Sequence, residues 1–343
     1  MPPPKPGVIP LRPLGLGEVL DGAFQSARHN GKAMFGSALI VQAISAILTL
    51  VISVFVIGPN SLDQIMNGTM SESDIGSLAI GAGASLLVAV LFQTLAQMVL
   101  QGALVIPVLR AVLNRKTTFG AMWQLARPRI GTLLLLALLY LGVEVLAFAV
   151  YVGIFVVLTI TLHGVGIGLG IVVGLALAAA SIWAALKVVL APAAVMVENV
   201  GVLAAIRSSW RLTTRHWWRT FGITLLASLI ASVIAGIVSF PISFIMGIVV
   251  AMINPNPSPD QIASQLILTQ VVSAVVSALV GAVTLAFQSG VMALLYVDLR
   301  MRRDGFDVVL LRESENGTDD GGIPGRSATP APAGPGSPYE QLP

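Results

Sequence analysis

Six long apolar stretches constrain this chain more than any other feature of its sequence. A helix needs about 20 predominantly apolar residues to cross a bilayer, and the chain contains six stretches longer than that. They lie at residues 33–58, 77–110, 130–160, 165–197, 219–253 and 261–298. We therefore predict an all-α integral membrane protein built as a bundle of six transmembrane helices.

The composition agrees with this fold class. Only 10% of the 343 residues are charged, whereas hydrophobic residues make up 56%. An average soluble domain is about 25% charged, so this chain is too poor in charge to cover its surface in water. It has no cysteine, which excludes disulfides and thiolate metal sites. The net charge of +3 comes from short basic clusters beside the apolar stretches, a pattern typical of lipid-headgroup contact rather than nucleic-acid binding.

Basic residues indicate the orientation. Every lysine and arginine except Lys187 lies in the N-terminal segment, after the second or fourth stretch, or in the C-terminal tail. Because basic segments stay in the cytoplasm, we predict that both termini are cytoplasmic. The predicted divisions are an N-terminal segment with an amphipathic helix (1–32), the transmembrane domain (33–311) and a disordered tail rich in Gly, Pro and Ser (312–343).

Short amphipathic segments precede the first, third and fifth stretches, at residues 16–28, 119–127 and 203–217. We predict three repeated units, each an interfacial helix followed by an antiparallel transmembrane pair. In the last segment arginines recur on one face and apolar side chains on another. Two interpretations stay open: this helix binds lipid or a partner, or it is an ordinary interfacial anchor. Its candidate surface residues are Arg207, Trp210, Arg211 and Arg215.

Three motifs resemble a known family. They are LGLGEVLDGAF at 14–24, the run from Ala191-Pro192 through Glu198 to AIRSSWRL at 205–212, and LLYVDLRMRRDG at 294–305. Over residues 11–311 the chain resembles the six-helix membrane domain of the glycerophosphoryl diester phosphodiesterase membrane-domain family, in its stand-alone actinobacterial type. The resemblance implies a bacterial cell membrane. The phosphodiesterase itself is a separate soluble domain with a His-Arg-Gly motif, which is missing here, so we expect no enzymatic activity and no cofactor.

Two ionisable residues lie well inside predicted helices, Glu144 and Lys187. A charge at the centre of a transmembrane helix costs about 2.5–3.5 kcal/mol. The two residues lie about 21 Å and about 15 Å from the inner ends of their helices at 1.5 Å per residue, so their long side chains could pair. They form either a functional pair that gates a pathway or binds an anionic headgroup, or a structural ion pair, or Lys187 reaches towards the cytoplasm.

Polar stripes run along the second and sixth helices. Since lipid cannot satisfy polar side chains, these stripes must face protein or water. They indicate either a polar cavity between the two helices or interhelical hydrogen bonding with small-residue packing. The glycines of 164–174 indicate close packing in a helical hairpin. The glutamines of the stripes are Gln93, Gln97, Gln101, Gln270 and Gln288.

No catalytic constellation appears in the sequence, and its three histidines lie in separate regions, so we predict no metal site. The leading prediction is a non-enzymatic scaffold or accessory subunit for envelope or lipid-related partners. The alternative is a transporter or channel for a lipid or small solute, using Glu144, Lys187 and the polar stripes. Expected partners are membrane lipids and a membrane or cytoplasmic protein, but no nucleic acid; the oligomeric state stays open.

Overall fold

The computed structural model describes residues 5–56, 71–253, 259–316 and 319–326. Every regular element in these ranges is helical, which confirms the all-α prediction. Five helical stretches are long and apolar enough to cross a membrane. The long helices are α2 (Gly31–Val56), α4 (Glu72–Val112), α6 (Ile130–Val188), α9 (Trp217–Ile253) and α10 (Pro259–Asp304). The short helices are α1 (Leu16–His29), α5 (Phe119–Ala126), α7 (Ala191–Glu198), α8 (Val202–Thr214) and α11 (Phe306–Glu315), with a 3₁₀ turn at Arg127–Arg129.

Helix α6 is a hairpin of two arms. Its direction breaks at His163, whose φ of 49° and ψ of −124° are not helical. Glycines of the second arm then lie directly against the first. A Cβ atom at Gly166 would lie 1.9 Å from the Leu158 carbonyl oxygen, and one at Gly170 would lie 2.4 Å from the Phe155 ring. The predicted glycine packing is thus confirmed, and the two arms account for the third and fourth apolar stretches.

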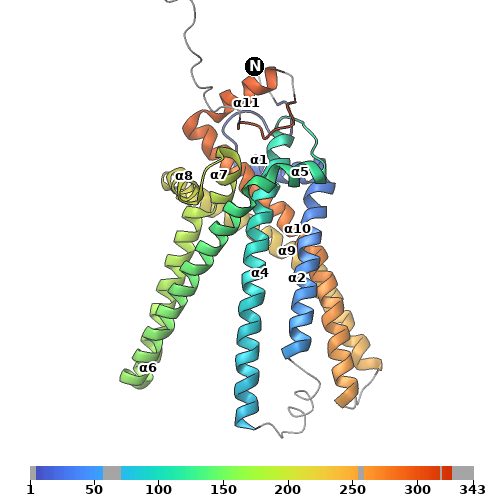
Figure 1. Ribbon diagram of the computed structural model, residues 1–343, viewed down its shortest axis with the longest axis vertical. Coiled ribbons are helices and arrows are strands. Elements are labelled where there is room, and N and C mark those ends of the chain that lie inside the picture. The colour runs from blue at the N-terminus through green and yellow to red at the C-terminus, as the bar shows by residue number, and fades with distance from the viewer. Residues whose placement is uncertain (1–4, 57–70, 254–258, 317–318, 327–343) are drawn as a thin grey trace, which may run out of the picture.

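The short helices gather at one end of the molecule, which we call the head (Figure 1). The core of the head consists of the ends of α4 and α10 and of nearly all of α7. Residues 102–112 of α4, 191–197 of α7 and 293–299 of α10 are all buried, and these three helices contact one another. Away from the head the long helices diverge, and the α6 hairpin leans away from α2, α9 and α10 (Figure 1).

The break between α6 and α7 corrects one predicted boundary. The fourth stretch was expected to continue to residue 197, but α6 ends at Val188. Pro192 has no N–H to bond the Val188 carbonyl four residues earlier. Tyr140 from the opposite arm replaces that donor, with its hydroxyl 2.6 Å from the Val188 oxygen. Ser209 of α8 satisfies two more groups at the break, donating to the Lys187 carbonyl and accepting from the Leu190 N–H.

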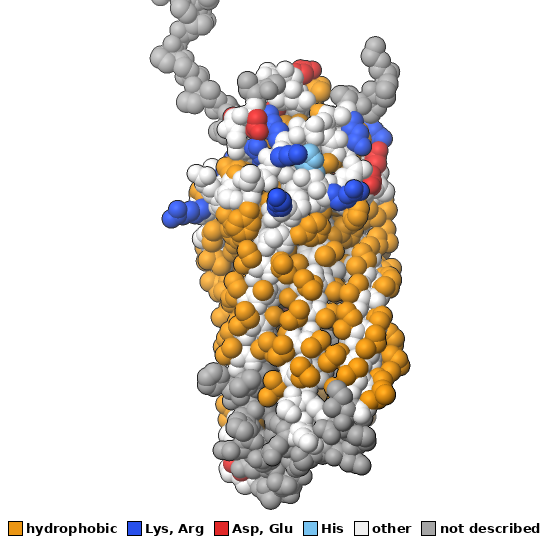
Figure 2. All heavy atoms as spheres, turned by 90° about the vertical axis from the view of Figure 1, so that its right-hand side faces the viewer, with side chains coloured by type: hydrophobic (Ala, Val, Ile, Leu, Met, Phe, Trp, Pro, Cys, Tyr) orange, Lys and Arg blue, Asp and Glu red, His pale blue; other side chains and the backbone are white. Residues whose placement is uncertain are grey.

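Helices α1 and α8 each expose a large apolar side chain on the side away from the head core. Leu203 of α8 is 74% exposed and Phe24 of α1 is 57% exposed, whereas the buried faces carry small residues such as Ala23 and Ala205. Figure 2 shows charged side chains gathered at the head end and hydrophobic ones along the long helices below. Helices α1 and α8 therefore present apolar surface outward where the apolar helices begin.

The C-terminal segment folds onto the head, so the predicted disordered tail is wrong for residues 312–316 and 319–326. Helix α11 continues to Glu315. Beyond it, Asp319 pairs with Arg110 at 2.7 Å, and Ile323 is 3% exposed. Glu313 pairs with Arg115 at 2.8 Å. Residues 327–343, which the same prediction covers, lie outside the described residues.

Candidate functional site

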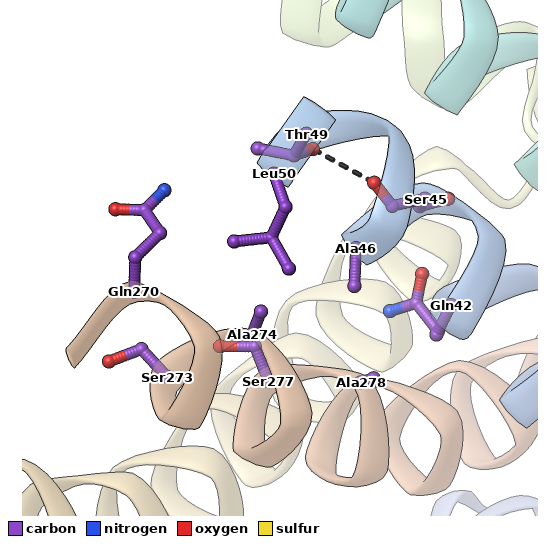
Figure 3. Close-up of a pocket in the computed structure, with 10 residues that line it drawn as sticks. All are labelled: Gln42, Ser45, Ala46, Thr49, Leu50, Gln270, Ser273, Ala274, Ser277 and Ala278. Atoms are coloured by element: carbon purple, nitrogen blue, oxygen red, sulfur yellow. Dashed lines mark hydrogen bonds between the residues drawn. The ribbon is translucent and has the colours of Figure 1, made fainter. Parts of the chain in front are cut away.

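A polar cleft along α2 is the candidate site. Helix α2 packs against α10 on one side and α4 on the other. Between α2 and α10 lies a cavity of about 310 Å³, in which polar side chains of both helices face one another (Figure 3). Its polar lining is Gln42, Ser45, Thr49, Gln270, Ser273 and Ser277.

The helix backbone orients the two hydroxyls of α2. Ser45 donates to the Val41 carbonyl at 2.9 Å and Thr49 donates to the Ser45 carbonyl at 2.9 Å (Figure 3). Such bonds to the preceding turn occupy the hydroxyl protons. Both hydroxyl oxygens can therefore present lone pairs to a ligand that donates hydrogen bonds.

Gln42 of α2 contacts both neighbouring helices, α10 and α4. A Cβ atom at Gly281 of α10 would lie 2.0 Å from the Gln42 amide nitrogen, so the Gln42 side chain lies directly against this glycine. The Gln42 oxygen accepts a long bond of 3.4 Å from Gln93 of α4. A second cavity of about 340 Å³ between α2 and α4 shares Ser45 and Thr49 with the first. The polar cleft thus lies on both sides of α2.

One of the two interpretations of the polar stripes placed a cavity between the second and sixth helices. Those helices are α4 and α10, and the polar space lies where each of them meets α2. Gln270 lines the first cavity and Gln93 the second. The other predicted glutamines, Gln97, Gln101 and Gln288, are half-buried and line neither cavity. Sequence analysis missed Gln42, Ser45 and Thr49, although their spacing of three and four residues marks one helical face.

Glu144 and Lys187 do not form the pair that the sequence allowed. Lys187 is only 5% exposed. Its ammonium group lies 5.6 Å from the Trp183 ring centre, 5.5 Å from the Trp210 ring centre and 3.4 Å from the Thr214 hydroxyl. Because α6 ends at Val188, Lys187 lies beside α8 rather than midway along a helix. Glu144 is exposed on the first arm and has no ion-pair partner within the described ranges.

The surface candidates on α8 have different roles. Trp210 packs edge-on against Trp183, with ring centres 5.4 Å apart, and so fixes α8 to the α6 hairpin. The carbonyl of Arg211 accepts a bond from the Arg303 guanidinium. All four predicted residues of this surface are exposed: Arg207, Trp210, Arg211 and Arg215. The structure therefore joins Trp210 and Lys187, which sequence analysis placed in separate groups.

A buried carboxylate links three parts of the head. Asp298 is fully buried and pairs with Arg219 of α9 at 2.9 Å and with Arg302 of α10 at 3.0 Å. It also accepts from the Leu14 N–H at 2.8 Å. The sequence signal was the LLYVDLRMRRDG motif, which contains Asp298 and Arg302, but nothing in it identified Arg219 or Leu14 as partners.

Metal binding finds no support in the described part of the chain, where His, Asp and Glu side chains form no group of three suited to hold an ion. The fold and the cleft define an all-α protein in which long apolar helices extend from a compact arginine-rich head. A family described as Domain of unknown function (DUF7847) matches residues 14–299, and the chain belongs to this family. No curated protein and no solved structure matches this chain.

Proposed function

We propose that this chain is an integral protein of a bacterial cell membrane that crosses the bilayer six times, with its head and both termini in the cytoplasm. Five long apolar stretches support this proposal, because the stretch with the α6 hairpin can cross twice. The segregation of lysine and arginine supports the orientation. The outward apolar side chains of α1 and α8 suit helices that lie at the membrane surface.

Within that membrane, the chain acts as a non-enzymatic scaffold or accessory subunit that binds a partner's transmembrane helix through the α6 hairpin. The carrying observation is Glu144, an exposed carboxylate on a hairpin that packs mainly on itself. Between residues 138 and 185 of α6, the buried residues are Gly166 and Gly170, and both face the other arm of the hairpin. A lone charge costs about 2.5–3.5 kcal/mol at this depth, and a polar or basic group of a partner helix would lower that cost.

The resemblance to the membrane domain of the glycerophosphoryl diester phosphodiesterase membrane-domain family supports envelope or lipid-handling proteins as the class of partner. In that family the membrane domain accompanies a soluble enzyme in some chains. We propose that a stand-alone chain supplies the same membrane support to a separate protein.

Photo-crosslinking in the native membrane tests the scaffold role. A photoreactive amino acid replaces Phe148, which is 65% exposed and lies one turn beyond Glu144. We expect a single protein adduct of defined mass. When Glu144→Leu is combined with this probe, the yield of the adduct should fall about tenfold, because an interhelical polar contact in membranes contributes about 1–2 kcal/mol.

Two controls make this test specific. The change Val143→Leu, beside Glu144 but apolar, should leave the adduct unchanged. The same probe at Ile237 of α9, which is 69% exposed, should give no such adduct. Lipid adducts alone at residue 148, or a protein adduct that survives Glu144→Leu, would refute the role of the hairpin.

A second candidate function is translocation of a lipid or small solute, favoured by the polar cleft on both sides of α2.

Ser277→Leu would fill the α2–α10 cavity, whereas Val275→Leu, 56% exposed on the same helix, would not. In proteoliposomes, transbilayer movement of a fluorescent phosphatidylglycerol should slow about tenfold with Ser277→Leu only, as expected when a filled cavity raises a barrier by about 1.4 kcal/mol. Movement no faster than in protein-free liposomes would count against translocation of this lipid.

A further inference from the structure

A third cavity, of different chemistry, lies in the head, apart from the α2 cleft. Its volume is about 250 Å³. Residues from the end of α7, from α8, from the end of α10 and from the returning C-terminal segment line it. Its charged lining consists of Glu198, Arg211, Arg300, Asp304 and Arg326. Three arginines thus face two carboxylates in a small space.

The carboxylates of this cavity are already engaged. One oxygen of Glu198 accepts hydrogen bonds from the Ser208 hydroxyl at 2.7 Å and the Tyr296 hydroxyl at 2.8 Å. Asp304 lies 3.8 Å from Arg300 and 3.8 Å from Arg303, distances of ion pairs but longer than hydrogen bonds. Neither carboxylate therefore saturates the hydrogen-bonding groups of the arginines.

Arg300 has hydrogen-bond donors that are not satisfied. Its guanidinium is held against aromatic rings, 4.5 Å from the centre of Phe306 and 5.8 Å from that of Tyr296. Two of its nitrogens, Nε and Nη1, are buried and have no hydrogen-bond partner among the described residues. Buried donors are normally satisfied, so a guanidinium fixed in this state indicates a missing acceptor.

Arg326 adds a second unbalanced charge. The amide oxygen of Asn199 accepts from Arg326 and also from Arg129, the latter at 2.6 Å. Two guanidinium groups thus share one neutral oxygen, and in the described ranges neither forms a salt bridge with a carboxylate. Burial lowers the pKa of the Arg326 guanidinium, and the positive charge of Arg129 lowers it further. An anion beside these groups would relieve their repulsion.

We propose that this head cavity binds a phosphate group, held by Arg211, Arg300 and Arg326. Arginine presents planar paired donors that match the oxygens of phosphate. The phosphate belongs either to an anionic lipid headgroup or to a soluble phosphate compound. This site is independent of the scaffold role proposed for α6.

Binding measurements on the full chain test the proposal. The protein is purified in phosphate-free detergent and titrated at constant ionic strength with inorganic phosphate, pyrophosphate or short-chain phosphatidic acid. Arg326→Gln is the main variant, because this side chain lies outside the head core. Arg312→Gln, exposed on α11 and outside the cavity, is the matched control. Arg300→Gln is a third variant, interpreted only if its unliganded thermal unfolding matches the wild type.

We expect saturable binding that weakens at least about tenfold in Arg326→Gln and is unchanged in Arg312→Gln, because loss of one charged hydrogen bond changes affinity by about that factor. Binding of inorganic phosphate or pyrophosphate with this pattern would identify a soluble ligand. Binding of phosphatidic acid alone with this pattern would identify a lipid headgroup. No saturable binding of any probe, or equal binding by Arg326→Gln and Arg312→Gln, would overturn the site.

Discussion

Replacing Asp298 with leucine is expected to destabilise the head by about 3 kcal/mol. Removing one partner of a buried ion pair costs about 3–5 kcal/mol, because the other charge stays without compensation. Here two arginines and the Leu14 N–H lose their shared acceptor. The arginine side chains are 26% and 29% exposed, so water compensates part of the loss and the lower end of the range applies.

Thermal unfolding of the protein in lipid nanodiscs at a fixed scan rate measures this effect. Asp21→Leu is the control, because Asp21 is exposed on α1, where its carboxylate accepts a hydrogen bond from the nearby Gln25 side chain. Asp298→Leu should unfold at a clearly lower temperature than both the wild type and the control. If the two variants unfold at the same temperature, Asp298 does not hold the head together.

Replacing Gly166 with leucine is expected to force the two arms of α6 apart. The new Cβ atom would lie 1.9 Å from the Leu158 carbonyl oxygen, and a backbone atom cannot move aside as a flexible side chain can. Overpacking costs about 1–3 kcal/mol where neighbours can adjust, so we expect a loss at the upper end of that range. Gly168, two residues away, has no atom within 4 Å of such a Cβ.

Spin labels at Val157 and Val172, both exposed, report the separation of the arms. The chain has no cysteine, so labels attach only where cysteines are introduced. The distance between the labels should increase in Gly166→Leu and stay at the wild-type value in Gly168→Leu. An equal distance in both variants would show that Gly166 does not set the hairpin spacing.

Local sequence patterns predicted the helices well, because each long helix is marked by its own apolar run. The three amphipathic helices and the glycine-packed hairpin were also readable from spacing alone. The end of α6 was not, because Pro192 in an apolar run is equally compatible with a kinked helix. The structure ends the helix at Val188, and bonds from Tyr140 and Ser209 satisfy the backbone groups there.

The candidate sites depended on contacts between distant parts of the chain. Glu144 and Lys187 were matched by depth, but the earlier end of α6 places Lys187 against Trp210 instead. Asp298 binds Leu14, 284 positions away, and no local pattern specifies such a contact. The composition of the tail predicted disorder, yet contacts such as the Asp319–Arg110 pair and the buried Ile323 hold residues 319–326 on the head.

The most direct test of the proposed membrane arrangement uses single cysteines in this cysteine-free chain. Gly164 and Gly201 are exposed, at the hairpin turn and in the head respectively. With a membrane-impermeant maleimide on intact cells, Gly164→Cys should be labelled at once, and Gly201→Cys only after permeabilisation. If Gly164→Cys is labelled only after permeabilisation, or Gly201→Cys is labelled on intact cells, the six-crossing arrangement with a cytoplasmic head is wrong.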